Sequence, residues 1–291
     1  MNQNTQSNLY QKLRQRLLNR FRIPLDGLRY TKMAFQGNLI QLPIEHITDE
    51  FAFSLAPQGW NYQCAIAEAY DRNPGVNLEE TIYFRFFNND QINAVTCLQE
   101  ILFLADTQKW NSQNNFKFYL GTYPWGGLTL DEAGTPFGWY YDQVEDKMTR
   151  DLWGYKKTLW YQPNARYTID LEWDITTQLL VKLKSGYHPW YYLSFPSVTL
   201  LVNSQGEKRG IIVDGHHRLA ILSYLGYKEA RVEVTKVVKE KDVEAWYYVK
   251  HGYCKIEQAL EIFHSFFTLN GRERIEFLNL ETNFILDKSQ H

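Results

Sequence analysis

Six consecutive residues, Val213-Asp214-Gly215-His216-His217-Arg218, carry the side chains best suited to chemistry in this sequence. An apolar run precedes them and a helical pattern follows, which predicts a strand, a tight turn and a helix. Glycine lets the backbone turn sharply and lets a ligand come close. The first N–H groups of a helix lack partners, and the helix dipole favours an anion there. Because an arginine fork also matches phosphate oxygens, the segment predicts an anion site.

The same residues have a plainer interpretation. Asp214 is a favoured residue for capping a helix, and the two histidines and the arginine could form a solvated first turn. Neighbouring helical residues project about 100° apart, so at most one of the histidines is expected to meet a ligand squarely. The residue types alone leave phosphate binding and a solvated turn equally open.

The stretch from Arg209 to Val238 resembles the core of the ParB/sulfiredoxin superfamily, in which a G-x-x-R turn opening a helix binds nucleotide phosphates. Within that group, the V-D-G-H-H-R run most resembles the free serine kinases, which use ADP or ATP to phosphorylate a small hydroxyl substrate. The resemblance extends over about seventy residues, from near 167 to 238. It implies that ATP or ADP, or alternatively CTP, binds at four residues: Gly215, His216, His217 and Arg218.

Two differences between this sequence and members of the superfamily narrow the functions that the resemblance implies. Sulfiredoxins carry a catalytic cysteine in the turn, where this chain has His216, so reduction of a sulfinic acid is not expected. ParB partition proteins read G-E-R-R there and add a basic helix-turn-helix, whereas the C-terminal part of this chain is rich in glutamate. A role in chromosome segregation is therefore not expected.

Asp214 suggests a metal ion. A carboxylate beside bound phosphates is repelled unless a cation bridges them or the carboxylate acts as a base. Mg²⁺ bound by one carboxylate and by nucleotide oxygens would resolve this conflict. We therefore expect Asp214 to act as a metal ligand or a catalytic group, with His217 as a second catalytic candidate.

A kinase also needs a group that accepts the proton of the substrate hydroxyl. In the serine kinases a glutamate just before the first helix of the domain has this role. The matching region holds Asp170, Glu172 and Asp174, and we prefer Glu172. The alternative for Asp174 is that it caps a helix beginning at Ile175.

Composition limits the function classes. The net charge of −2 argues against a broad nucleic-acid surface, because duplex binding depends on many cationic contacts with phosphates. The three cysteines are widely spaced and form no C-x-x-C pair, which favours reduced thiols in a cytoplasmic protein. No apolar run approaches the length of a membrane span.

The pattern of elements predicts an α+β fold, and the resemblance implies that its core is a ParB/sulfiredoxin-like mixed sheet. We expect residues 1–165 to form an aromatic-rich N-terminal α+β region, 166–240 the nucleotide-binding core that the resemblance implies, and 241–291 a helical C-terminal extension. Periodicity predicts extended segments at 39–44, 81–87, 167–173, 198–202, 210–213 and 231–238. It predicts helices at 9–21, 91–104, 175–184, 216–225, 243–249, 256–267 and 272–278.

Three functions are consistent with these features. The first, which we prefer, is a nucleotide-dependent phosphotransferase that acts on a small hydroxyl-bearing molecule. The second is a non-catalytic nucleotide-binding sensor or scaffold in a biosynthetic pathway. The third is a DNA-associated protein, which would bind DNA in a salt-sensitive way.

Overall fold

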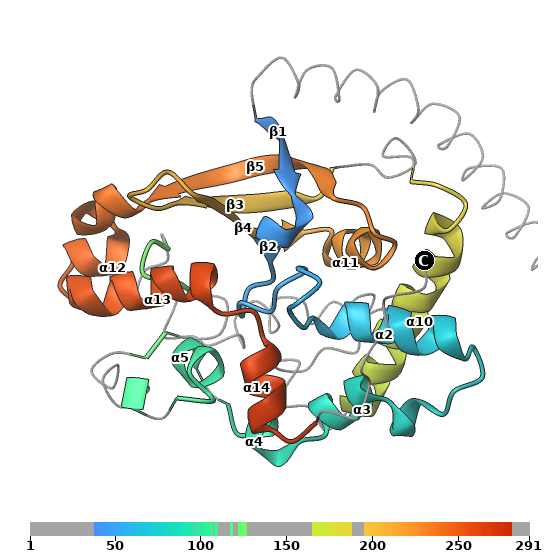
Figure 1. Ribbon diagram of the computed structural model, residues 1–291. Coiled ribbons are helices and arrows are strands. Elements are labelled where there is room, and N and C mark those ends of the chain that lie inside the picture. The colour runs from blue at the N-terminus through green and yellow to red at the C-terminus, as the bar shows by residue number, and fades with distance from the viewer. Residues whose placement is uncertain are drawn as a thin grey trace, which may run out of the picture.

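The structure is a computed structural model that describes residues 38–95, 97–106, 108–109, 117–118, 122–126, 165–187 and 195–280. The helix expected at 9–21 lies outside these residues. The described part is an α+β protein in which a five-stranded mixed sheet curls into a half-barrel with several helices packed around it (Figure 1). The α+β class predicted from the sequence is confirmed.

The strands come from two distant parts of the chain: β1 (Leu39–Pro43), β2 (Ile47–Thr48), β3 (Ser197–Val202), β4 (Lys208–Asp214) and β5 (Glu229–Lys239). They lie in the order β1-β5-β3-β4-β2. The predicted hairpin is present, because β3 pairs with β4 in antiparallel register. β5 runs parallel to β3, and β1 runs antiparallel to β5.

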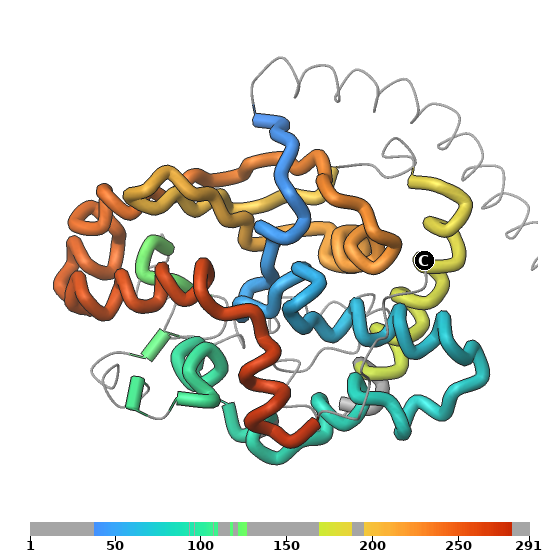
Figure 2. Tube along the Cα trace, viewed as in Figure 1, coloured from blue at the N-terminus to red at the C-terminus, as the bar shows by residue number. Residues whose placement is uncertain are grey.

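Two strands of the sheet precede the range 166–240 that was expected to hold the core. Strand β1, in blue in Figure 2, pairs in antiparallel register with the first part of β5, in orange. At the other edge, β2 pairs in parallel with β4, and Ile47 lies opposite Gly210. The sheet therefore extends beyond 166–240, and its two edges are formed by residues 39–48.

The described helices surround one side and the ends of this sheet: α2 (Tyr62–Arg72), α3 (Ile82–Phe87), α4 (Asp90–Asn93), α5 (Leu98–Leu102), α10 (Ala165–Leu183), α11 (His216–Tyr224), α12 (Tyr247–Lys250), α13 (Ile256–Thr268) and α14 (Arg272–Phe277). The described residues also include three short 3₁₀ helices: η1 (Ile44–His46) between β1 and β2, η2 (Leu78–Glu80) between α2 and α3, and η4 (Glu240–Ala245) between β5 and α12. Helices α2, α10 and α11 pack against one another, and Figure 1 shows α12 and α13 at the opposite end of the sheet. The helices predicted at 216–225, 256–267 and 272–278 are confirmed within a residue or two.

The strand predicted at 167–173 is wrong, because these residues belong to the single long helix α10. Alternation of large apolar residues suggested a strand. The buried positions instead recur at helical spacing, at Ile169, Glu172, Thr176, Leu180 and Leu183. Two of these positions are polar, so the sequence pattern concealed the helical stripe.

Asp174 does not cap a helix, contrary to the alternative raised for it, because it lies inside α10 and is exposed.

The strand predicted at 81–87 is also wrong. This segment is helix α3, and the hydroxyl of Thr81 caps it by accepting a hydrogen bond from the N–H of Phe84 at 3.1 Å. Tyr83, Phe86 and Phe87 are buried, a spacing of three and four residues that fits one helical face. β-branched and aromatic residues favour strands, but tertiary packing overrides that preference here.

The helix predicted at 91–104 is divided into α4 and α5. Cys97 has an extended backbone, with φ −147° and ψ 166°. The N–H of the next residue, Leu98, donates to the carbonyl of Phe118 at 2.7 Å. This bond to a distant segment replaces the helical bond that would have continued α4 into α5.

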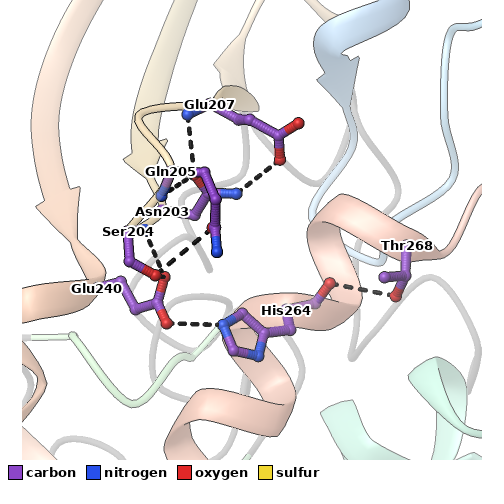
Figure 3. Close-up of polar contacts among 7 residues, drawn as sticks. All are labelled: Asn203, Ser204, Gln205, Glu207, Glu240, His264 and Thr268. Carbon is purple, nitrogen blue, oxygen red and sulfur yellow. Dashed lines mark hydrogen bonds and ion pairs between the residues drawn. The ribbon is translucent and has the colours of Figure 1, made fainter.

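The turn of the β3–β4 hairpin is joined to the helices at that end of the sheet (Figure 3). The carboxylate of Glu240, at the start of η4, accepts hydrogen bonds from the N–H and hydroxyl of Ser204 at 2.6 and 2.7 Å. Its other oxygen lies 3.0 Å from Nε2 of His264 in α13. One carboxylate therefore holds together a turn, a 3₁₀ helix and an α-helix.

No helix within the described residues combines the length and apolar character that crossing a bilayer requires.

Candidate functional site

The turn between β4 and α11 has the backbone geometry that the sequence predicted. Gly215 precedes the first helical residue with φ 87° and ψ 26°, in the left-handed region that favours glycine. A Cβ at this position would lie 2.9 Å from Cβ of Pro196 and 3.0 Å from Nη2 of Arg218. The turn therefore requires glycine both for its dihedral angles and for the close approach of these neighbours. No side chain caps the N-terminus of α11 within the described part of the chain.

Arg218 lies beside this turn and contacts Asp214. Its Nη2 donates to Oδ2 of Asp214, four residues earlier at the end of β4, at 3.3 Å. The arginine side chain is 10% exposed and the aspartate side chain is 63% exposed. The sequence predicted a guanidinium directed at phosphate, and the structure instead shows it engaged with the carboxylate of its own motif. Asp214 itself faces solvent and does not cap the helix.

His216 forms a pair that the sequence did not predict. Its Nε2 lies 2.9 Å from Oε2 of Glu50, a residue 166 positions earlier in the chain. Both side chains are partly buried. Glu50 follows β2, and His216 follows β4 with Gly215 between. Because β2 and β4 are parallel neighbours, their C-terminal ends lie at the same edge of the sheet and bring these residues together.

His217 forms the second pair, with the glutamate preferred from the sequence. Nε2 of His217 lies 2.9 Å from Oε2 of Glu172. The Glu172 side chain is 8% exposed and lies on the buried face of α10, which packs against α11. The structure therefore brings together Glu172 and the turn. The two histidines, although they project in different directions, each meet a carboxylate from a different element.

Electrostatics couple the first pair tightly. Burial raises the pKa of Glu50, but the charge and hydrogen bond of His216 outweigh that effect and leave the pKa below its usual value. Burial lowers the pKa of His216, but the charges of Glu50, Asp49 and Glu172 outweigh it and leave the pKa raised. Both shifts favour a carboxylate beside an imidazolium. The positive charge of His216 is therefore balanced by carboxylates within the protein.

Asp49 adds a third carboxyl group beneath this pair. Its Oδ1 accepts hydrogen bonds from the N–H groups of Phe51 and Phe53, both at 2.9 Å. Burial and the neighbouring charge of Glu50 raise the pKa of Asp49 to about 7, against the opposing effect of those backbone bonds. The carboxyl groups of Asp49, Glu50 and Glu172 also raise the pKa of Tyr62, after burial as the largest cause. These groups form one electrostatic cluster.

No protein-family model matches this chain, and the searches of curated proteins and of solved structures likewise found no match. The site must therefore be interpreted from its own geometry.

Asp49 and Glu50 are the functional candidates that sequence reasoning missed. The local signal is two adjacent acidic residues that follow Ile47 and Thr48. Such a pair is common at solvated strand ends, so the signal is weak. Only the pairing of β2 with β4, which brings Glu50 beside His216, identifies these residues as part of the site.

Within the described residues, no group of three or more histidine, cysteine, aspartate or glutamate side chains is arranged to hold a metal ion. The carboxylate of Asp214 is exposed and stands beside the turn. Mg²⁺ often takes only one or two protein carboxylates and completes its shell with phosphate oxygens and water. The Asp214 carboxylate suits that limited role.

Proposed function

We propose that this protein is a nucleotide-dependent phosphotransferase that acts on a small hydroxyl-bearing molecule. The observation that carries the proposal is the convergence of two histidine–carboxylate pairs at the glycine turn that opens α11. Phosphate transfer to a hydroxyl requires an anion site and a proton acceptor within one site. The pairs, together with the helix N-terminus, offer both.

The phosphate would bind at the start of α11, where the backbone of His216 and His217 follows Gly215. The helix dipole favours an anion there. Burial lowers the pKa of His216, but the neighbouring carboxylates outweigh it and raise the pKa, so they keep the ring protonated while also offsetting its positive charge. Arg218 would join the phosphate contacts. Its bond to Asp214 is 3.3 Å long and is made to a largely exposed carboxylate, whose charge water and salt screen. A phosphate that accepts two guanidinium bonds would compete with it successfully.

Proton transfer would use His217. Because Glu172 holds Nε2, the second ring nitrogen, Nδ1, is the atom that would accept the proton of the substrate hydroxyl. Glu172 would then orient the ring and stabilise the imidazolium that forms. The two histidines thus receive different roles, since the charge cluster around His216 favours its protonated form. The nucleotide, ATP or ADP or alternatively CTP, supplies the phosphoryl group, and Mg²⁺ would screen Asp214 from it.

The mixed sheet and the glycine turn that leads from β4 into α11 support a ParB/sulfiredoxin-type core, as the sequence resemblance implies. On this proposal β1 and β2 belong to that core along with 197–239.

A thermal-shift panel tests nucleotide binding first. ATP, ADP, CTP and GTP are each added with and without Mg²⁺, and we expect at least one to raise the melting temperature of the wild-type protein. Arg218→Ala should lose most of that rise. His251→Gln, at an exposed histidine distant from α11 in sequence, serves as the matched control. If no nucleotide raises the melting temperature of the wild-type protein, the proposal fails.

Measurements of turnover then separate a phosphotransferase from a non-catalytic sensor or scaffold. Nucleotide consumption is measured with mixtures of small hydroxyl compounds, and His217→Gln should reduce it by about 10²-fold or more while the thermal shift persists. Nucleotide binding without turnover in the wild-type protein would favour the non-catalytic sensor or scaffold. Salt-sensitive binding of DNA in place of a nucleotide would favour the third function.

A further inference from the structure

Arg274, in the C-terminal helix α14, is buried completely and makes its hydrogen bonds to backbone carbonyls. Nη1 donates to the carbonyl of Phe51 at 2.5 Å and to that of Ile101 at 3.2 Å, and Nη2 donates to the carbonyl of Ala52 at 2.7 Å. The guanidinium also lies 3.9 Å from the centre of the Phe53 ring. Its side chain is 0% exposed. Burial is the main cause of its lowered pKa, about 10, so the group stays charged at neutral pH.

Three of these partners lie in the loop that directly follows Glu50. Ala52 in that loop has φ 59°, a left-handed conformation that is costly for a residue with a Cβ. Such a backbone persists only where surrounding contacts fix it. The carboxylate of Asp49 holds the loop from one side, through the N–H groups of Phe51 and Phe53. Arg274 holds it from the other side, through the carbonyls.

Helix α14 is itself seated closely on this loop. Its preceding residue, Gly271, has φ 93°, and a Cβ there would lie 2.5 Å from the Phe53 ring and 2.8 Å from the carbonyl of Trp60. The N–H of Ser54 donates to the carbonyl of Asn270 at 3.1 Å. The position of the loop is therefore set jointly by the guanidinium and by the backbone at the start of α14.

We propose that Arg274 is a positioning residue for Glu50, which it keeps within hydrogen-bond distance of His216 by fixing the loop carbonyls that follow. Without the guanidinium, three buried carbonyls lose a charged donor, and the Ala52 conformation loses the contacts that hold the loop on the side facing α14. The loop would then relax and withdraw Glu50 from the imidazole. Any effect of this withdrawal on phosphate binding rests on the proposed function, but the coupling between Arg274 and His216 does not.

The test is a titration of His216 by NMR in the full chain, with no nucleotide present. His216→Gln identifies the signal by its disappearance. In the wild-type protein the midpoint should lie above the usual histidine value of 6.5, because Glu50, Asp49 and Glu172 face the ring and outweigh its burial. Glu50→Gln should lower the midpoint. Arg274→Lys and Arg274→Met should lower it in the same direction, with the methionine variant affected more.

The control comes from the same helix. Arg272 donates from Nε to the carbonyl of Gln58 at 3.1 Å, and its hydrogen bond is at an exposed site. Arg272→Met should therefore leave the His216 midpoint at the wild-type value. The double variant Arg274→Lys/Glu50→Gln should titrate like Glu50→Gln alone, because the arginine acts through the glutamate.

Thermal melts accompany each titration. If Arg274→Met fails to fold, Arg274→Lys decides the question, since lysine keeps the charge and can reach a carbonyl. A folded Arg274→Lys with the wild-type His216 midpoint would overturn the proposal, and so would a double variant whose midpoint falls well below that of Glu50→Gln. A lowered midpoint in a protein that consumes no nucleotide would uphold the positioning role and refute the phosphotransferase. An unchanged midpoint in a protein that consumes nucleotide would refute the positioning role and uphold the phosphotransferase.

Discussion

At the scale of single residues, the turn before α11 is held by backbone constraints that can be measured separately from any ligand. Gly215 combines a left-handed conformation with tight contacts, and Gly206 has a similar φ of 83° but nothing within 4 Å of where a Cβ would lie. Substitutions at the two glycines can therefore distinguish the cost of backbone strain from the cost of steric overlap.

Gly215→Ala should destabilise the protein by about 2 kcal/mol or more, because overlap with Pro196 and Arg218 adds to the dihedral strain. Gly206→Ala should cost about 1 kcal/mol, from strain alone. Urea denaturation of both variants, analysed with a common slope, measures the difference. Equal losses of stability in the two variants would contradict the tight turn.

The Glu50–His216 pair makes a further prediction about pH. Because His216 outweighs burial and lowers the pKa of Glu50, this residue stabilises the fold above the usual value of 4.5, and the effect is lost as pH falls through the lowered pKa. Because its neighbouring carboxylates outweigh burial and raise the pKa of His216, the histidine stabilises the fold below 6.5, and the effect is lost as pH rises through the raised pKa. Both contributions are present between these limits.

Glu50→Gln should therefore lower the melting temperature most between pH 4.5 and 6.5, and progressively less as the pH moves outside that window. Parallel melts of the wild-type protein and the variant, from about pH 3 to about pH 9, provide the measurement. A difference that stays constant over the whole range would show that the pair has no linked titration.

At the scale of elements, helices and strands are held in place by single polar side chains at several junctions. Glu240 joins the hairpin turn to α13 (Figure 3), much as Arg274 joins α14 to the loop after β2. Burial tends to raise the pKa of Glu240, but its bonds to Ser204 and His264 outweigh this and lower it. The carboxylate is thus suited to remain charged in its folded environment.

Glu240→Ala should destabilise the protein by about 1 to 2 kcal/mol, because charge-assisted bonds to the backbone and hydroxyl of Ser204 are lost. Glu207→Ala is the matched control in the same turn. Glu207 contacts only the exposed amide of Asn203 among the bonds drawn in Figure 3, so its loss should cost about 0.5 kcal/mol or less. Urea midpoints of the two variants should differ accordingly, and a reversed order would contradict this account.

At the scale of the whole molecule, the segment that carries the motif depends on residues far from it. β1 and β2 form the two edges of the sheet, and α2 packs against α11 and α10. The core beneath the sheet includes Leu42, Ile44, Ile47 and Leu55, all buried and all outside 166–240. Residues 166–240 are therefore not the whole of the folding unit.

A fragment of residues 166–240 should not fold in isolation. It would expose the apolar surface that residues 39–55 cover, and β5 would lose its antiparallel partner. Circular dichroism and the dispersion of amide NMR signals give the readout. A cooperative melt of the fragment, with dispersed signals, would show that the first strands are dispensable.

The sequence by itself determined the features that depend on neighbouring residues. Gly215 sets the turn, and the apolar pattern after it sets α11. The hairpin of β3 and β4 follows from a short turn between two apolar runs. Periodicity misled where polar residues occupied buried positions, as in α10, and where aromatic residues favoured a strand but packed as a helix, as in α3.

Only the tertiary structure decided which groups meet. His216 contacts Glu50 across 166 positions, and His217 contacts Glu172 across 45. Arg274 reaches Phe51 across 223. No local pattern encodes such contacts, because they arise from the parallel pairing of β2 with β4 and from the packing of α10 and α14. Local dihedral preferences fix a turn, but burial and strand pairing bring distant carboxylates to it.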